Sequence, residues 1–360
     1  MNKEFSKDYV KIIPFDPLSN SRETWNLYHE YHATLHNQRF PDSPFTTSHE
    51  TIEKSLQLFM EHPQIDPVYF SIMDTIAQKQ IGDILCTILS KNSETYKENP
   101  NYMEFYINIL EGYHRKGIGT LALAKVRDVA LEYERTLLAT DTNYQTGKAF
   151  LQALSAELEI GIENRLQLKD VNWSMVEQWM NEGQEHSPQT SLVKLDSIPE
   201  DIIEQFSKVY TEIYNQQPWE DLDEVAIIFT PEYFRHRLRA FTETGALWIV
   251  FLTIEGDEKI SGLTEMIYGP DFRTLITQEL TGVKQEYRGR GLGKWLKAEM
   301  LLKIKEDFPE VTTIRTDNAT TNAAMLSIND RLGFKFFRES IEAHITLEKL
   351  NQYLSSKNLP

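Results

Sequence analysis

The sequence lacks several features that would place it outside the ordinary globular proteins. Its 360 residues include one cysteine, Cys86, which excludes a disulfide framework and any zinc site built from several cysteines. No run approaches the roughly 18 uninterrupted apolar residues of a membrane helix. No apolar signal-peptide core follows the first residues. Together these absences predict a cytoplasmic protein.

Positive charge is also scarce. Lys and Arg number 37 against 54 Asp and Glu, for a net charge of −17. An acidic chain of this size binds nucleic acid and anionic membranes poorly, so neither partner is expected. A small anionic ligand stays possible, because a short basic loop can bind one locally.

The chain instead holds an internal repeat. At one to two hundred residues per domain, its length predicts two domains. Residues 113–119 (Tyr-His-Arg-Lys-Gly-Ile-Gly) resemble residues 287–293 (Tyr-Arg-Gly-Arg-Gly-Leu-Gly), 174 positions later. An amphipathic segment follows each, and then a Thr-Asp pair, with the two pairs 176 positions apart. This nearly constant offset favours a duplicated domain.

Each half predicts the same order of elements: strand, two helices, three strands, glycine loop, helix, strand and helix. We therefore expect a mixed α/β fold with domains at residues 1–168 and 191–360, and a linker at 169–190 that holds a short helix. The strands expected before the glycine loops span residues 10–15, 68–74, 79–89 and 102–110 in the first half, and 191–195, 247–254, 259–268 and 275–283 in the second.

The second glycine loop indicates a phosphate site. It follows a strand and opens a helix, where unpaired N–H groups and partial positive charge favour anions. The glycines of residues 289–293 let the backbone close around such a group. Arg288, Arg290 and Lys294 add positive charge beside them.

Three interpretations of this loop are weighed. A Walker A loop needs Ser or Thr after Gly-Lys, and here Trp295 follows Lys294, so that interpretation fails. A dinucleotide fingerprint belongs after the first strand of a domain, not late in it. A tight turn whose glycines serve packing alone stays open, but the second copy of the loop favours phosphate binding.

Residues 287–293 resemble the acetyl-CoA pyrophosphate loop of the GNAT superfamily of N-acetyltransferases. Its motif is Arg/Gln-x-x-Gly-x-Gly/Ala, and Arg288, Gly291 and Gly293 fill the three specified positions. Residues 322–334 are similar to a later motif of the superfamily, an Asn followed by a helix that ends in Leu-Gly-Phe. The tandem arrangement resembles two-domain members of the mycothiol synthase type. The resemblance implies two tandem GNAT-like acyl-CoA N-acyltransferase domains, each with a mixed α+β sheet.

The resemblance also implies a site. The fourth and fifth strands of such a domain splay apart, the pantetheine arm of acetyl-CoA lies between them, and no metal takes part. Asn322 stands where the family's Asn contacts the cofactor, and Val283 would offer backbone groups to the pantetheine arm. The pyrophosphate would be held by the amides of Arg288, Gly289, Arg290, Gly291, Leu292, Gly293 and Lys294.

The sequence departs from the family pattern in both halves. Many members carry a proton-donating Tyr seven residues after the Asn, where this chain has Asn329. Another group or water then protonates the thiolate, or the domain is not a conventional catalyst. In the first half His114 replaces the Arg or Gln, and both the later Asn and the Leu-Gly-Phe ending are missing. We expect the first domain to be degenerate, with a possible second cofactor loop at Arg115, Lys116, Gly117, Ile118 and Gly119.

Acidic residues offer candidate bases. Glu279, on the expected fourth strand, is either the base that deprotonates an amine or a solvent-facing strand residue, and Glu265 has the same two interpretations. Acids in residues 219–224 either recognise a cationic acceptor or belong to a solvated loop.

We predict transfer of an acetyl or short acyl group from CoA to a small-molecule amine. Two alternatives stay open, a non-catalytic acyl-CoA-binding regulator and a protein lysine or N-terminal acetyltransferase. Either a monomer or a homodimer fits a chain that already holds two related domains.

Overall fold

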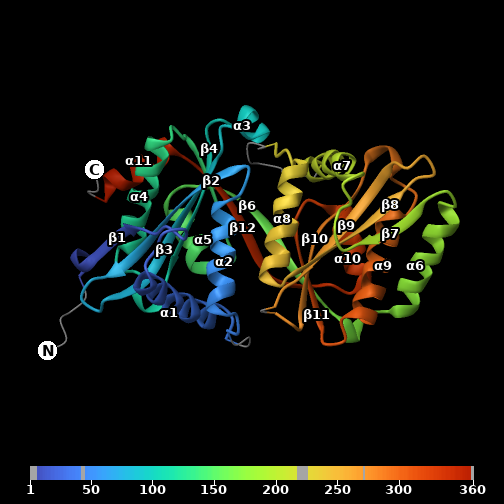
Figure 1. Ribbon diagram of the computed structural model, residues 1–360, viewed down its shortest axis with the longest axis horizontal. Coiled ribbons are helices and arrows are strands. Elements are labelled where there is room, and N and C mark those ends of the chain that lie inside the picture. The colour runs from blue at the N-terminus through green and yellow to red at the C-terminus, as the bar shows by residue number, and fades with distance from the viewer. Residues whose placement is uncertain (1–5, 42–44, 217–225, 271, 358–360) are drawn as a thin grey trace. The chain divides into compact units, whose positions relative to one another are not determined.

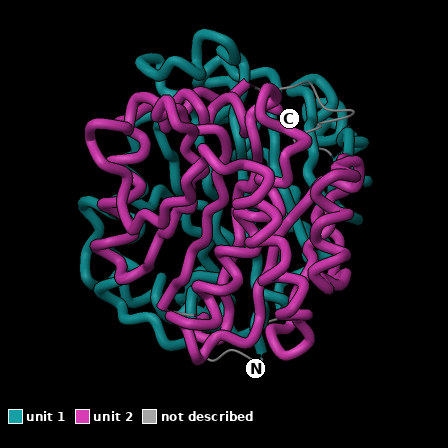
Figure 2. The backbone as a smooth tube through the Cα atoms, turned by 90° about the vertical axis from the view of Figure 1, so that its right-hand side faces the viewer, with its two compact units in different colours: residues 1–158, 341–360 teal, residues 159–340 magenta. Residues whose placement is uncertain are grey.

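The computed structural model describes residues 6–41, 45–216, 226–270 and 272–357. The acidic segment 219–224 lies outside them. The chain divides into two compact units, coloured separately in Figure 2. Unit 1 comprises residues 1–158 together with 341–360, and unit 2 comprises residues 159–340.

The sheet of unit 1 runs in the order β1-β2-β3-β4-β5-β12. Neighbouring strands are antiparallel except β4 and β5, which are parallel. The elements, most of them labelled in Figure 1, are β1 (Val10–Pro14), α1 (Arg22–Arg39), α2 (His49–Met60), β2 (Ile65–Asp74), β3 (Lys79–Leu89), α3 (Glu94–Glu98), β4 (Tyr102–Ile109), α4 (Ile118–Glu132), β5 (Leu137–Thr142), α5 (Gln145–Ala153) and α11 (Leu347–Ser356), with the second part of β12 (Lys335–Thr346).

Unit 2 repeats this plan, with the sheet order β6-β11-β10-β9-β8-β7. Here β10 and β11 form the parallel pair, and the other neighbours are antiparallel. The elements are β6 (Glu157–Gln167), α6 (Trp173–His186), β7 (Ser191–Leu195), α7 (Ile203–Asn215), α8 (Pro231–Thr244), β8 (Leu247–Ile254), β9 (Ile260–Tyr268), β10 (Leu275–Val283), α9 (Leu292–Asp307), β11 (Thr313–Ala319) and α10 (Ala323–Leu332). The predicted order of elements is confirmed in both halves.

The two halves of the chain exchange a strand. Strand β6, at the end of the first half, pairs with β11 in unit 2. Strand β12, at the end of the second half, pairs with β5 in unit 1. Apolar burial follows the exchange, since Leu166 of β6 lies in the core of unit 2, and Ile341 and Ile345 of β12 lie in that of unit 1. The units therefore do not end at the predicted domain boundaries, which assumed that each half keeps its own last strand.

The predicted linker is part of the core of unit 2. Residues 173–186 form helix α6, and its Val176 and Trp179 are buried against α9. Gly183 marks the closest approach, because a Cβ there would lie 2.6 Å from the Cβ of Trp295. Only glycine allows α6 to pack this tightly, so the segment is a structural helix and not a connector.

Helices cover both faces of each sheet. In unit 1, α4 packs on one face through Ala122 and Val126, and α1 packs on the other through Tyr28. In unit 2, α9 takes the position of α4, and Phe206 of α7 and Phe234 of α8 lie on the opposite face. Strand β8 is apolar and buried along most of its length, as expected of a strand covered on both sides. Among the described helices, none combines the length and apolar character needed to cross a membrane.

Candidate functional site

Two parallel strands of unit 2 separate to form an opening in the sheet. β10 and β11 pair over Leu275–Thr277 and Thr313–Arg315. Beyond that point β10 continues to Val283 beside β9, and β11 continues to Ala319 beside β6. Facing backbone edges are thus left without strand partners, and an extended ligand can pair with such an edge. This opening, called the wedge below, is the geometry that the family resemblance implied.

A β-bulge lies on β10 beside the wedge. Gln278 pairs with Met266 and Thr281 pairs with Thr264, so Glu279 and the next residue face one residue of β9. The extra residue is left out of the ladder and turns the local backbone. The bulge therefore takes backbone groups of β10 out of the ladder beside the wedge.

The glycine loop follows β10 and opens helix α9. Gly289 has a φ of +82° and Gly291, the N-cap of α9, has a φ of +83°, values that favour glycine. A Cβ at either position would meet no atom within 4 Å, so the space around the loop is open. Within the described residues, the N–H groups of residues 289–293 have no acceptor. Such a loop suits a phosphate or pyrophosphate, as predicted from the sequence.

Arg288 fastens the loop to the end of β10. Its Nε donates to the carbonyl of Val283 at 3.0 Å, and its Nη2 donates to Oε1 of Gln216 at 2.5 Å. The side chain thus stabilises the turn between β10 and α9 from an exposed position. The predicted roles of Val283 and of the Arg288 amide in holding CoA remain predictions.

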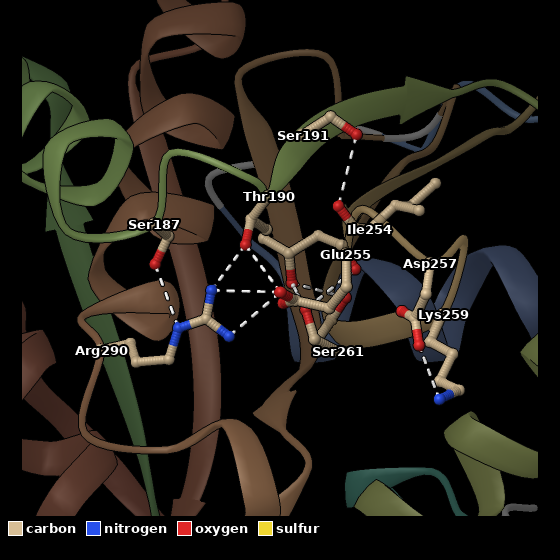
Figure 3. A network of polar contacts seen from close by, with 11 residues as sticks. Ser187, Thr190, Ser191, Ile254, Glu255, Asp257, Lys259, Ser261 and Arg290 are labelled. Atoms are coloured by element: carbon tan, nitrogen blue, oxygen red, sulfur yellow. Dashed lines mark hydrogen bonds and ion pairs between the residues drawn. The ribbon is translucent and has the colours of Figure 1, made fainter.

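Arg290 points away from the loop. Its guanidinium donates to Glu255 at 3.1 Å and to Thr190 at 2.6 Å, and its Nε donates to Ser187 at 3.2 Å (Figure 3). The side chain therefore ties the loop to the segment between α6 and β7 and to the end of β8. It is not the free cation beside the phosphate that the sequence suggested, and Arg290 can serve the anion through its amide. The Nζ of Lys294 lies 5.7 Å from the ring centre of Trp179.

Asn322 begins helix α10. Its Oδ1 accepts the N–H of Met325 at 3.2 Å, the usual role of an N-cap side chain. This explains why an Asn stands there without any ligand, and its predicted contact with the cofactor stays a prediction. The open glycine Gly293 lies near, because its missing Cβ would be 3.8 Å from Ile328 of α10 and 3.9 Å from Val283.

The two candidate bases differ in their surroundings. Glu265 is fully buried, and both its oxygens are held, by Tyr210 and Trp248 at 2.6 Å each and by Arg237 at 3.4 Å. A carboxylate so fully paired with a guanidinium is a structural group and a poor base. Glu279 lies on the bulge with its side chain exposed.

The protein around Glu279 favours a proton on its carboxylate. Although solvent reaches part of this side chain, desolvation by the surrounding protein raises the pKa of Glu279, and the nearby Glu265 raises it further. Arg237 and Arg315 offset part of this rise. A raised pKa moves a carboxylate toward the range of a base that works near neutral pH.

Sequence reasoning missed one functional candidate, Lys297 of α9. Its Nζ donates to Oε1 of Gln278 at 2.9 Å and to Oδ1 of Asn329 at 2.5 Å, and all three side chains are buried. Asn329 in turn donates to Asn318 of β11 at 2.8 Å. The sequence signal was a charged residue on the buried side of a helix, in line with Leu301 and Ile304 one and two turns later.

Unit 1 has the same loop with fewer of the other features. β4 and β5 pair only over Tyr102–Glu104 and Leu137–Ala139, so they separate too. Gly117 has a φ of +79° at the start of α4, and Arg115 has a φ of +59°, matching Gly291 and Gly289. Nε2 of His114 lies 2.8 Å from the carbonyl of Ile109, as Arg288 lies against Val283.

The two units differ along the strand before the loop. Pairing of β3 with β4 is uninterrupted from Gly82–Ile109 to Ile88–Met103. Tyr102 corresponds to Leu275, 173 positions later, and Ile109 corresponds to Val283, 174 positions later. The one-residue change in offset is the bulge, which unit 1 lacks.

The fold and the paired glycine loops together define a class: the chain has the tandem GNAT fold. No protein-family profile matches the sequence, and no curated protein does. The assignment of this fold rests on its similarity to solved structures. A tandem GNAT protein from the clavulanic acid biosynthesis pathway aligns with a TM-score of 0.70 and 18% identity, over 94% of this chain and 98% of that one.

Two further structures share the fold at low identity. A GCN5-related N-acetyltransferase from Sphaerobacter thermophilus aligns with a TM-score of 0.59 and 11% identity, over 95% of this chain and 97% of that one. The N-myristoyltransferase of Saccharomyces cerevisiae, solved with bound myristoyl-CoA, aligns with a TM-score of 0.57 and 10% identity, over 96% of this chain and 80% of that one.

Proposed function

We propose that the chain transfers an acetyl or short acyl group from CoA to a small-molecule amine, with unit 2 as the working unit. The observation that carries this proposal is the meeting of three features at one place in unit 2. These are the open glycine loop at the start of α9, the wedge between β10 and β11, and the bulge on β10. They match, in order, a pyrophosphate, an extended pantetheine arm and a reacting carbonyl.

Each feature has a stated task in this proposal. The free amides of residues 289–293 hold the pyrophosphate. The unpaired edge of β10 binds the pantetheine arm as an added strand binds a sheet. Backbone N–H groups at the bulge polarise the acyl carbonyl and stabilise the negative charge that develops on its oxygen.

Glu279 is the proposed base. An amine acceptor enters the site protonated and attacks only after it loses a proton. The exposed carboxylate of Glu279 on the bulge takes that proton directly or through water. Because its pKa is raised, the rate should rise with pH as this carboxylate loses its proton.

The test is CoA release from acetyl-CoA with a panel of small amines. Wild type should release CoA with at least one amine. Glu279→Gln should lower the rate by about 10²-fold or more and remove the rise with pH. The control is Glu306→Gln, because Glu306 is exposed on α9 and pairs with Lys303. This variant should leave the rate and its pH dependence unchanged.

Other outcomes favour the alternatives. Binding of acetyl-CoA without CoA release on any amine would favour the non-catalytic regulator. Acetylated lysines or N-termini on co-expressed proteins, with no small-molecule activity, would favour a protein acetyltransferase. An unchanged rate in Glu279→Gln would remove Glu279 as the base.

A further inference from the structure

Lys297 is a buried lysine without a carboxylate partner among the described residues. It is 1% exposed. Its ammonium can donate three hydrogen bonds, and two acceptors are found in the described part of the chain, the amide oxygens of Gln278 and Asn329. The ring centre of Phe334 lies 5.4 Å from Nζ. One N–H donor is therefore left for another group.

The ammonium lies where the wedge begins. Gln278 directly follows Thr277, the last residue of β10 that pairs with β11. Asn329 reaches from α10 and binds Asn318 on β11, beyond the last residue of that strand that pairs with β10. Since Lys297 contacts both side chains, its Nζ lies beside the point where the strands diverge, on the face of the sheet that α9 covers.

Unit 1 shows that the fold does not need these polar groups. Gly117 and Gly291 are equivalent N-caps, so Lys297 corresponds to Leu123 on α4. Gln278 corresponds to Phe105, because each directly follows the last residue of its strand that pairs with the parallel neighbour, Thr277 in β10 and Glu104 in β4. Phe150 lies over Gly119 as Ile328 lies over Gly293, so Asn329 corresponds to Leu151. The three residues of unit 1 are buried and apolar.

Burying a lysine among neutral amides lowers the stability of the folded protein. Transfer of an ammonium from water to a protein interior is unfavourable, and neutral amides compensate only in part. Burial accordingly lowers the pKa of Lys297 to about 7. This free-energy cost falls on unit 2, which carries the bulge, whereas unit 1 avoids it with Leu123. The difference indicates that Lys297 has a role in the chemistry.

We propose that Lys297 gives a proton to the thiolate of CoA as it leaves, in place of a Tyr at position 329. This inference rests on the proposed acyl transfer. The amine nitrogen forms a bond to the acyl carbon, the carbon–sulfur bond breaks, and its electron pair stays on sulfur. The ammonium proton of Lys297 bonds to that sulfur, and neutral Lys297 regains a proton from water. The nitrogen loses one proton through Glu279 before it attacks and a second by the same route after the bond forms. One of these two protons balances the proton that water returns to Lys297, and the other is released to water.

Other charged groups on the surrounding elements have partners of their own. Glu265 points to the opposite face of the sheet, because the adjacent Thr264 faces Met300 of α9. Lys294 and Arg331 lie over the ring of Trp179. Glu279 lies close enough to Glu265, and to Arg315 and Asp317 of β11, for their charges to act on it, and Arg315 donates to Thr277 at 2.9 Å. On the face of the sheet that α9 covers, the ammonium of Lys297 is the charge that the described contacts place at the start of the wedge.

The test needs no acceptor. Thiolate absorbance of bound CoA is followed against pH in wild type, in Lys297→Met and in the control Lys303→Met, an exposed residue of the same helix. In wild type and control the bound thiol should ionise about one to three pH units lower than in Lys297→Met. Isothermal titration with desulfo-CoA, which lacks the sulfur, should give equal affinities in all three.

A second variant keeps the test sharp if Lys297→Met folds poorly. Gln278→Met, Lys297→Met and Asn329→Leu together, called the apolar triple variant below, copy the character of the positions that pack well in unit 1. The thiol should ionise in it as in Lys297→Met. If wild type binds CoA and both variants leave its ionisation unchanged, the role of Lys297 is overturned and the proposed function stands. If wild type does not bind CoA, the proposed function fails, and the role of Lys297 with it.

Discussion

Unit 1 and unit 2 share a loop but not the strand that leads to it. Both hold a left-handed residue at each of two loop positions, and both fasten the loop to the last carbonyl of the preceding strand. Only unit 2 adds the bulge and the buried lysine network. Loop geometry is therefore a property of the fold, and chemistry depends on what the neighbouring strand and helices present to it.

The largest expected effect comes from removing the bulge. Deletion of Leu280 gives β10 the uninterrupted register of β4 in unit 1. Because the amides that polarise the carbonyl lose their position, acetyl transfer should fall by about 10²- to 10³-fold. CoA binding through the glycine loop should be retained in isothermal titration. Transfer at the wild-type rate would show that the bulge does not separate the two units in function.

The lysine network, formed by Lys297, Gln278 and Asn329, should lower the stability of unit 2. The lowered pKa of Lys297 means that the unfolded state binds the proton more tightly, so its burial costs stability below about pH 7 and the cost fades as pH rises toward the ordinary lysine value. The apolar triple variant should therefore raise the free energy of unfolding by a few kcal/mol at pH 7, at about 1.4 kcal/mol per pKa unit. Urea unfolding at pH 7 and pH 10 checks this, and the gain should be smaller at pH 10. A loss of stability at both pH values would mean that the network holds unit 2 together.

The anchoring of the two loops should also differ, by a smaller amount. Arg290→Ala removes the charged contacts with Glu255 and should lower the free energy of unfolding by about 1–3 kcal/mol. Lys116, at the matching position, donates to the carbonyl of Gly112 at an exposed site, and its Nζ lies 5.0 Å from the ring centre of Tyr113. Lys116→Ala should change stability by no more than about 0.5 kcal/mol. Equal losses in thermal or urea unfolding would contradict this difference.

The sequence predicted the features that depend on local pattern. Both glycine loops, the order of helices and strands and the mixed α/β class follow from turn residues and periodicity, and the structure has them. The strand exchange was out of reach, because β6 and β12 have the pattern of a last strand in either unit. Which strand each one pairs with depends on contacts far along the chain.

Within the site, side-chain direction was the limit. The sequence placed Arg290 beside an anion, and the structure turns it toward Glu255. It treated Glu265 and Glu279 alike, although neighbouring strand positions and the bulge bury one and expose the other. Lys297 was not predicted as a site residue. Its importance becomes visible only when it is compared with Leu123, and that comparison needs the register of both units.

The central claim is that unit 2 alone holds the acyl-CoA site, and isothermal titration of acetyl-CoA tests it most directly. Gly291→Glu places a side chain at a φ of +83° and a carboxylate in the open anion cradle, while Gly117→Glu makes the matched change at a φ of +79° in unit 1. We expect one site in wild type, lost in Gly291→Glu and retained in Gly117→Glu. A two-site isotherm with one site lost in each variant, or binding lost only in Gly117→Glu, would contradict it.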